Sequence, residues 1–186
     1  MTQIASIRST ETIAPESRIG RVLEQHQLKV SSLIGTGNYG QIYLGESLDG
    51  RKKYAMKCLP RVGLSKQEAF WQWNEIHLMQ ELQGHSNMIK FYGVVEDKDA
   101  LWVIMEKARM DLYDALKKIN ESVPEGSKPR GFQPAVVREI FSEVCSSIQY
   151  CHDKNIAHRD IKLENVLVGE DFRVRFVPFI ASHQIA

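Results

Sequence analysis

Three glycines in one short loop, at positions 35, 37 and 40, constrain this chain more than any other feature of its sequence. Residues 28–34 before the loop and residues 41–47 after it read as β-strands, with Ile42 and Tyr43 on opposite faces of the second. Glycine has no Cβ, so the backbone of such a loop can approach a phosphate closely and direct N–H groups at it. The pattern therefore predicts a phosphate-binding loop between two strands.

The element that follows the third glycine separates two folds that share the G-x-G-x-x-G pattern. A dinucleotide-binding fold has a helix there, with the phosphate at the helix N-terminus. Here residues 41–47 read as a strand, residues 48–50 as a turn and residues 53–59 as a third strand. This order favours an antiparallel sheet and argues against a dinucleotide-binding oxidoreductase.

Two charged side chains downstream are candidates for a pair that holds phosphate. Strand alternation places Ala55 and Lys57 on one face of the sheet, where the small alanine side chain leaves room for a flat ring such as a nucleobase. The alternative is that Lys57 is an ordinary strand lysine exposed to solvent. An S-x-x-E capping box at residues 65–68 predicts a helix over residues 66–82. Glu75 in that helix is the candidate partner of Lys57, and the alternative is an ordinary surface glutamate.

Residues 158–165, H-R-D-I-K-L-E-N, bring three different functional groups into one segment. Asp160 offers a carboxylate that can accept a proton, and Lys162 offers an ammonium that can hold a phosphate. Asn165 offers an amide oxygen, which suits a hard cation. These three residues are the candidate catalytic residues, and Asn165 is also the candidate metal ligand.

The glycine loop, the Y-A-M-K strand at residues 54–57 and the H-R-D-x-K-x-x-N segment together resemble the protein kinase family. The lysine two residues after the aspartate is the form typical of serine/threonine kinases. The resemblance implies an α+β fold, with a small lobe of five antiparallel strands and one helix and an incomplete helical large lobe. It also implies ATP and Mg²⁺ as cofactors. The residues it assigns to ATP binding are Ile34, Gly35, Thr36, Gly37, Asn38, Tyr39, Gly40, Ile42, Ala55, Lys57, Glu75, Met105, Glu106 and Ala108.

Specific roles follow from the same resemblance. Met105 would be the gatekeeper at the back of the base pocket, and main-chain groups near Glu106 and Ala108 would bind the adenine edge. Asp160 would accept or orient the proton of a substrate hydroxyl, and Lys162 would neutralise charge on the transferring phosphoryl group.

The expected domain organisation has four parts. Residues 1–27 are a flexible tail with room for a short helix, and residues 28–106 are the small lobe. Residues 107–176 are the hinge and a partial large lobe, and residues 177–186 are a tail unlike a kinase. Within the third part, residues 120–133 are expected as a flexible insertion and residues 134–153 as a helix. Its apolar residues predict one buried face, and they are Val137, Ile140, Phe141, Val144, Cys145, Ile148 and Cys151.

The family's D-F-G position reads Pro178-Phe179-Ile180 in this chain. Proline has no side-chain oxygen for a metal, so weakened phosphoryl transfer is expected. The unfamiliar ending is expected to come from a frameshift, a retained intron, an alternative exon or a gene-model error. Two functions follow: a serine/threonine protein kinase, and, as the alternative, a catalytically inactive module that binds a nucleotide or a partner.

Composition limits the partners and the compartment. A net charge of +1 gives no electrostatic case for nucleic acid or an anionic membrane, and no apolar run approaches the length of a membrane span. Three cysteines without metal-ligand spacing suggest free thiols in a reducing compartment. We therefore expect a cytoplasmic or nuclear protein whose partners are a protein substrate or a regulatory protein.

Overall fold

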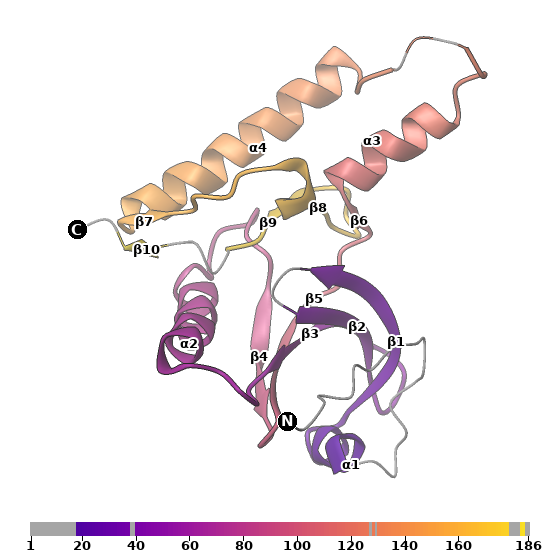
Figure 1. Ribbon diagram of the computed structural model, residues 1–186. Helices are drawn as coiled ribbons and strands as arrows, with labels where there is room; N and C mark the ends of the chain where they lie inside the picture. Colours follow the sequence, from indigo (N-terminus) through magenta and orange to yellow (C-terminus); the bar gives the residue numbers. More distant parts are fainter. Residues whose placement is uncertain (1–17, 38–39, 127, 129, 179–182, 185–186) are drawn as a thin grey trace. The chain divides into compact units, whose positions relative to one another are not determined.

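The computed structural model describes most of the chain, namely residues 18–37, 40–126, 128, 130–178 and 183–184. The chain divides into two compact units (Figure 1). The first unit comprises Met1–Val62 and Gly93–Met105, and the second comprises Gly63–Tyr92 and Glu106–Ala186. The division differs from the expected lobes, because the helix after residue 65 belongs to the second unit.

A five-stranded antiparallel sheet, in the order β1-β2-β3-β5-β4, is the main element of the first unit. The register pairs Gly37 with Gly40 across β1 and β2, and Ile42 with Lys57 across β2 and β3. The α+β class and the five-stranded antiparallel sheet predicted from the sequence are confirmed. The strands are β1 (Leu28–Gly37), β2 (Gly40–Ser47), β3 (Lys53–Pro60), β4 (Phe91–Glu96) and β5 (Ala100–Glu106).

A short helix, α1 (Arg18–Gln25), packs against this sheet. Leu23 of α1 is completely buried, in one cluster with Val30, Met56 and Ile104 from the strands. Burial of a leucine side chain contributes about 2 kcal/mol, enough to hold a short helix that would be unstable alone. The stretch expected as a tail thus contains a packed helix at residues 18–25; residues 1–17 lie outside the described residues.

Helix α2 (Lys66–Glu81) begins in the second unit where the capping box predicts. The Ser65 Oγ accepts a hydrogen bond from the Glu68 main-chain N–H, and the Glu68 carboxylate accepts one from the Ser65 N–H. The two bonds satisfy donors that the first turn of a helix leaves unpaired. Glu75 lies on the buried side of α2, together with Ile76 and Met79.

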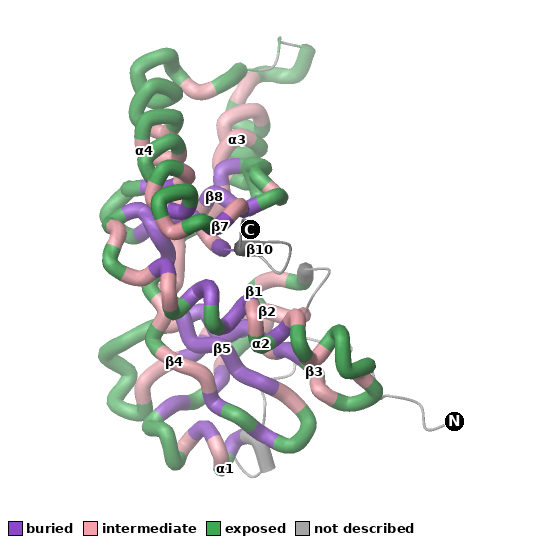
Figure 2. The backbone as a smooth tube through the Cα atoms, turned by 90° about the vertical axis from the view of Figure 1, so that its left-hand side faces the viewer, coloured by how far each residue is buried: buried purple, intermediate pink, exposed green. Residues whose placement is uncertain are grey.

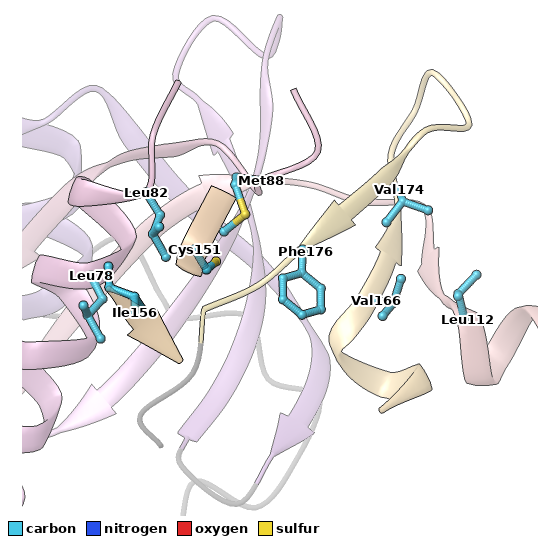
Figure 3. Close-up of a cluster of buried hydrophobic side chains, with 9 residues drawn as sticks. All are labelled: Leu78, Leu82, Met88, Leu112, Cys151, Ile156, Val166, Val174 and Phe176. Atoms are coloured by element: carbon cyan, nitrogen blue, oxygen red, sulfur yellow. The ribbon is translucent and has the colours of Figure 1, made fainter. Parts of the chain in front are cut away.

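The core of the second unit joins α2 to the segments around residues 150–176 (Figure 3). Phe176 is fully buried, and its main-chain N–H and C=O pair with Asn87 and Ile89 after α2. These bonds attach the segment that ends at Phe176 to the loop that follows α2. The nine buried members of this cluster are Leu78, Leu82, Met88, Leu112, Cys151, Ile156, Val166, Val174 and Phe176.

Helix α4 (Pro134–Asp153) has the bounds that its periodicity predicts, with Pro134 in the first turn. Its apolar face is covered only in part, as the green and pink stretches of α4 in Figure 2 show. Ile140, Val144 and Ile148 pack against the core cluster, but Val137 and Phe141 are exposed, Phe141 by 67%. The expected single buried face is therefore wrong for these two residues and for Cys145, which is also exposed, because no described element covers those positions.

Small elements complete the second unit. Strand β10 pairs antiparallel with β7, and β6, β8 and β9 form a three-stranded sheet. The expected insertion at residues 120–133 begins inside α3, and the expected tail at residues 177–186 contains β10. The bounds are β6 (Met110–Asp111), α3 (Leu112–Glu121), β7 (Ile156–Ala157), η1 (Leu163–Asn165), β8 (Val166–Val168), β9 (Val174–Phe176) and β10 (His183–Gln184).

Candidate active site

The three polar side chains of residues 158–165 meet in the second unit. The 3₁₀ turn η1 directs the amide of Asn165 back onto Asp160. The Asn165 Nδ2 donates to the main-chain oxygen of Asp160 over 2.6 Å and to the carboxylate Oδ2 over 2.9 Å. Because Asn165 is only 3% exposed, this buried amide fixes the shape of the loop and the orientation of the Asp160 carboxylate.

Lys162 completes the arrangement from the solvent side. Its Nζ lies 3.0 Å from Oδ2 of Asp160. The hydrogen bond from Lys162, with a further one from Asn165, lowers the pKa of Asp160 below its ordinary value. The carboxylate is therefore ionised at neutral pH. Both side chains remain partly exposed, at 32% for Asp160 and 43% for Lys162, so a substrate can reach them.

His158 holds the loop at residues 158–165 through contacts with main-chain atoms. Its Nε2 lies 2.7 Å from the main-chain oxygen of Val177, and its Nδ1 lies 3.3 Å from the main-chain nitrogen of Asp160. Burial lowers the pKa of His158, which favours the neutral ring. A neutral ring with its proton on Nε2 satisfies both contacts, because it donates to Val177 and accepts from Asp160. The ring also packs on Phe176, with 4.3 Å between centroids.

The backbone at Arg159 adopts a left-handed conformation, with φ of 63°. Residues other than glycine rarely adopt this region, and holding one there costs roughly 1–3 kcal/mol. The contacts of His158 and Asn165 on either side supply the surrounding structure that maintains it. Such local strain is common where a loop must present a side chain in one direction.

The candidate phosphate loop lies in the first unit, at the end of β1 and the start of β2. A Cβ at Gly40, where φ is +148°, would lie 2.3 Å from the main-chain oxygen of Cys58. Gly40 is thus required by its close approach to β3, in addition to any approach to phosphate. Gly35 tolerates a Cβ at ordinary contact distance, while Ile34 and Thr36 are exposed. Asn38 and Tyr39 lie outside the described residues.

The other residues assigned to ATP fall in both units. Ala55 and Lys57 are buried on β3, and Met105 is buried on β5. Glu75 is buried in the second unit, so its pairing with Lys57 stays a prediction. The main-chain N–H of Glu106 donates to the oxygen of Lys90 over 2.8 Å. The oxygen of Ala108 accepts a hydrogen bond from the Lys107 Nζ over 3.3 Å.

Comparison with known proteins identifies the family. The family model for the protein kinase domain matches residues 28–185. The chain belongs to the protein kinase family. A negative regulator of sexual conjugation and meiosis from Schizosaccharomyces pombe is 30% identical over 158 residues, which are 84% of this chain and 32% of that protein.

Further relatives carry kinase names. A carbon catabolite-derepressing protein kinase from Candida albicans is 28% identical over 169 residues, covering 91% of this chain and 25% of the relative. The serine/threonine-protein kinase SIK1 of Mus musculus is 28% identical over 151 residues, which are 81% of this chain and 18% of that protein. The chain thus spans about a third of the length of these relatives or less. The family predicted from the sequence is confirmed, and the match includes residues 177–185.

Kinase domains in general use ATP with a divalent metal. Among the described residues, no group of three or more His, Cys, Asp or Glu side chains could hold a metal ion. Asn165 offers one amide oxygen, while the Asp160 carboxylate is engaged by Lys162. Pro178 is buried and offers no side-chain oxygen. A magnesium site usually needs one or two protein carboxylates beside waters and substrate phosphates, and with the Asp160 carboxylate engaged these described residues do not fit one.

The structure gives roles to two residues to which the sequence patterns assigned none. His158 supports the main chain of Asp160, and Arg175 in β9 contacts the Glu106 carboxylate. A signal for Arg175 was present, because a charged residue stands between Val174 and Phe176 in an otherwise apolar strand. Within the described part of the chain, no helix is long and apolar enough to span a bilayer.

Proposed function

We propose that this chain binds ATP and transfers its γ-phosphate to the hydroxyl of a protein serine or threonine. The observation that carries the proposal is the Asp160 carboxylate, which is ionised, partly exposed and held by Lys162 and Asn165. An ionised carboxylate can orient a hydroxyl and accept its proton as the oxygen attacks phosphorus. The family membership of the chain supports this reaction class.

Each candidate residue has a role in this proposal. Lys162 neutralises charge on the transferring phosphoryl group, and Asn165 holds the Asp160 carboxylate in place. In the first unit, Lys57 binds the phosphates of ATP, and the glycines at 35, 37 and 40 let the main chain approach them.

Pro178 supports a second function, a kinase-like module that binds nucleotide or a protein partner and transfers phosphate slowly or not at all. The residue is buried next to Val177, whose main chain contacts His158 and Asn165. A missing metal ligand at this place costs on the order of 10²- to 10⁴-fold in rate. Both functions share nucleotide binding and differ in the rate of transfer.

A transfer assay with matched variants distinguishes the two functions. The wild-type chain and the variants Asp160→Asn, Pro178→Asp and Pro178→Ala are incubated with radiolabelled ATP, Mg²⁺ and a mixture of protein substrates. Transfer by the wild-type chain that Asp160→Asn abolishes supports the kinase. ATP binding without transfer, with activity appearing in Pro178→Asp and not in Pro178→Ala, supports the binding module. A folded chain that binds no ATP refutes both.

A further inference from the structure

A buried arginine connects strand β9 of the second unit to the segment predicted to bind adenine. Arg175 lies in β9, and its side chain is only 5% exposed. Its Nε lies 3.0 Å from both carboxylate oxygens of Glu106. Its Nη2 donates to the Asp171 Oδ2 over 2.7 Å, and its Nη1 donates to the main-chain oxygen of Val174 over 3.3 Å. All three guanidinium nitrogens are therefore engaged.

The local backbone is shaped to admit this guanidinium. A Cβ at Gly169 would lie 3.2 Å from the Arg175 Cζ and 2.7 Å from an oxygen of Asp171. Those separations are tighter than ordinary contacts, so a larger residue in the turn between β8 and β9 would displace the Arg175–Asp171 pair, and glycine leaves it room. The pair is thus built into the hairpin and does not depend on a chance surface contact.

Glu106 is held on two sides. Its carboxylate contacts Arg175 and also accepts a hydrogen bond from the main-chain N–H of Lys90 over 3.3 Å. Its own N–H donates to the main-chain oxygen of Lys90 over 2.8 Å. A peptide whose side chain and N–H are both fixed cannot rotate freely, so the direction of its main-chain groups is set.

We propose that Arg175 is a positioning residue that fixes the peptide at Glu106 and thereby selects adenine over guanine. The inference rests on the nucleotide binding proposed above and extends it to the choice of base. A buried ion pair is costly to desolvate and adds little stability, so its contribution here is geometric. Arginine suits this role because its planar fork meets a carboxylate through directed bonds.

Base selection follows from the orientation of the peptide. Adenine carries an amino donor at the position where guanine carries a carbonyl acceptor. A main-chain group held in one direction pairs with one base and leaves the other with an unsatisfied polar group, which a binding site rejects strongly. Without Arg175 the Glu106 peptide keeps its bonds to Lys90 but loses the contact that fixes its carboxylate, so it can tilt and accept either base. Loss of Arg175 should therefore reduce discrimination between ATP and GTP, in addition to the stability lost when the buried Glu106 carboxylate is left without its partner.

The test compares the affinities of the folded chain for ATP and GTP, measured in EDTA by competition with a fluorescent nucleotide. Arg175→Gln and Glu106→Gln are each expected to lower the ATP preference about 10-fold, the effect of one hydrogen bond to a charged or oriented group. The double variant should lose little more, because both changes break the same contact. Arg173→Gln is the matched control, since Arg173 lies in the same hairpin and pairs with Glu143; its ATP preference should stay within about twofold.

Arg175→Lys keeps the charge and loses the fork, so it is expected to fold and to show an intermediate preference. If Arg175→Gln does not fold, the lysine and Glu106→Gln variants decide the result. A wild-type chain that binds no ATP refutes both the proposed function and this inference. ATP binding with no preference over GTP, or with a preference unchanged in Arg175→Lys and Glu106→Gln, refutes only the role of Arg175.

Discussion

Replacing Asn165 with aspartate tests the ionised state of Asp160 directly. The substitution keeps the size of the side chain but puts a second carboxyl group where the Nδ2 now lies, 2.9 Å from the Asp160 Oδ2. Two charges about 3 Å apart repel by about 5 kcal/mol at an effective dielectric constant of 20. Protonating one carboxyl group at pH 7 costs only about 4 kcal/mol, from three pH units at 1.36 kcal/mol each. The variant should therefore take up a proton when it folds.

The sign of the pH dependence follows from that proton. The carboxyl pair has a raised pKa in the folded Asn165→Asp variant, while both groups have ordinary values in the unfolded chain. The folded state then binds more protons, so its stability recovers as the pH falls. The loss relative to wild type should be about 4 kcal/mol at pH 7 and about 1.5 kcal/mol at pH 5.

Urea unfolding at the two pH values measures this difference. Asn165→Ala is the control, because it removes the same hydrogen bonds without adding a charge, and it should lose about 1–3 kcal/mol at both pH values. A loss for Asn165→Asp that is the same at pH 7 and pH 5 would show that Asp160 is not an ionised neighbour of position 165. The proposed role of Asp160 as a proton acceptor would then have no basis.

Three further changes test other parts of the structure. Phe176→Ala should lower the unfolding free energy of the second unit by about 3–5 kcal/mol, measured by urea unfolding, because Phe176 is fully buried in its core. Burial lowers the pKa of His158 below 6.5, so the unfolded state takes up the proton first as the pH falls. The free energy of unfolding should therefore decrease as the pH drops below about 6.5. His158→Gln should remove that part of the pH dependence of stability. A thiol-alkylating reagent at neutral pH should label the exposed Cys145 first, because burial raises the pKa of Cys58 and of Cys151 to about 11, and mass spectrometry of the digested chain reads the order.

Local signals made several elements predictable. The capping box at residues 65–68 specifies the start of α2, because its two hydrogen bonds join residues three apart. The spacing of Asp160 and Asn165 likewise allows one helical turn to bring the amide onto the carboxylate. In each case the interacting groups are close in sequence, so the contact can be predicted from their spacing alone.

Contacts between distant residues were not predictable in the same way. Helical periodicity identified an apolar face on α4 but could not show which part of it another element covers, and Phe141 is exposed. Leu23 is buried only because strands far along the chain form a surface for it. Arg175 and Glu106 are 69 residues apart, and strand alternation says nothing about the partner of a buried charge.

Strand β9 links the two ends of the proposed reaction within the second unit. Arg175 holds the carboxylate of Glu106, where the base is predicted to bind. Two residues later, the Val177 oxygen accepts the hydrogen bond from the neutral ring of His158, which in turn contacts the main chain of Asp160. Phe176 lies between them in the core. Because a buried strand this short cannot shift one residue without the next, a change at Arg175 that moves β9 should also disturb the loop at Asp160. Transfer rates of the Arg175 variants must therefore be interpreted together with their base preference, and only the base preference isolates the effect at Glu106.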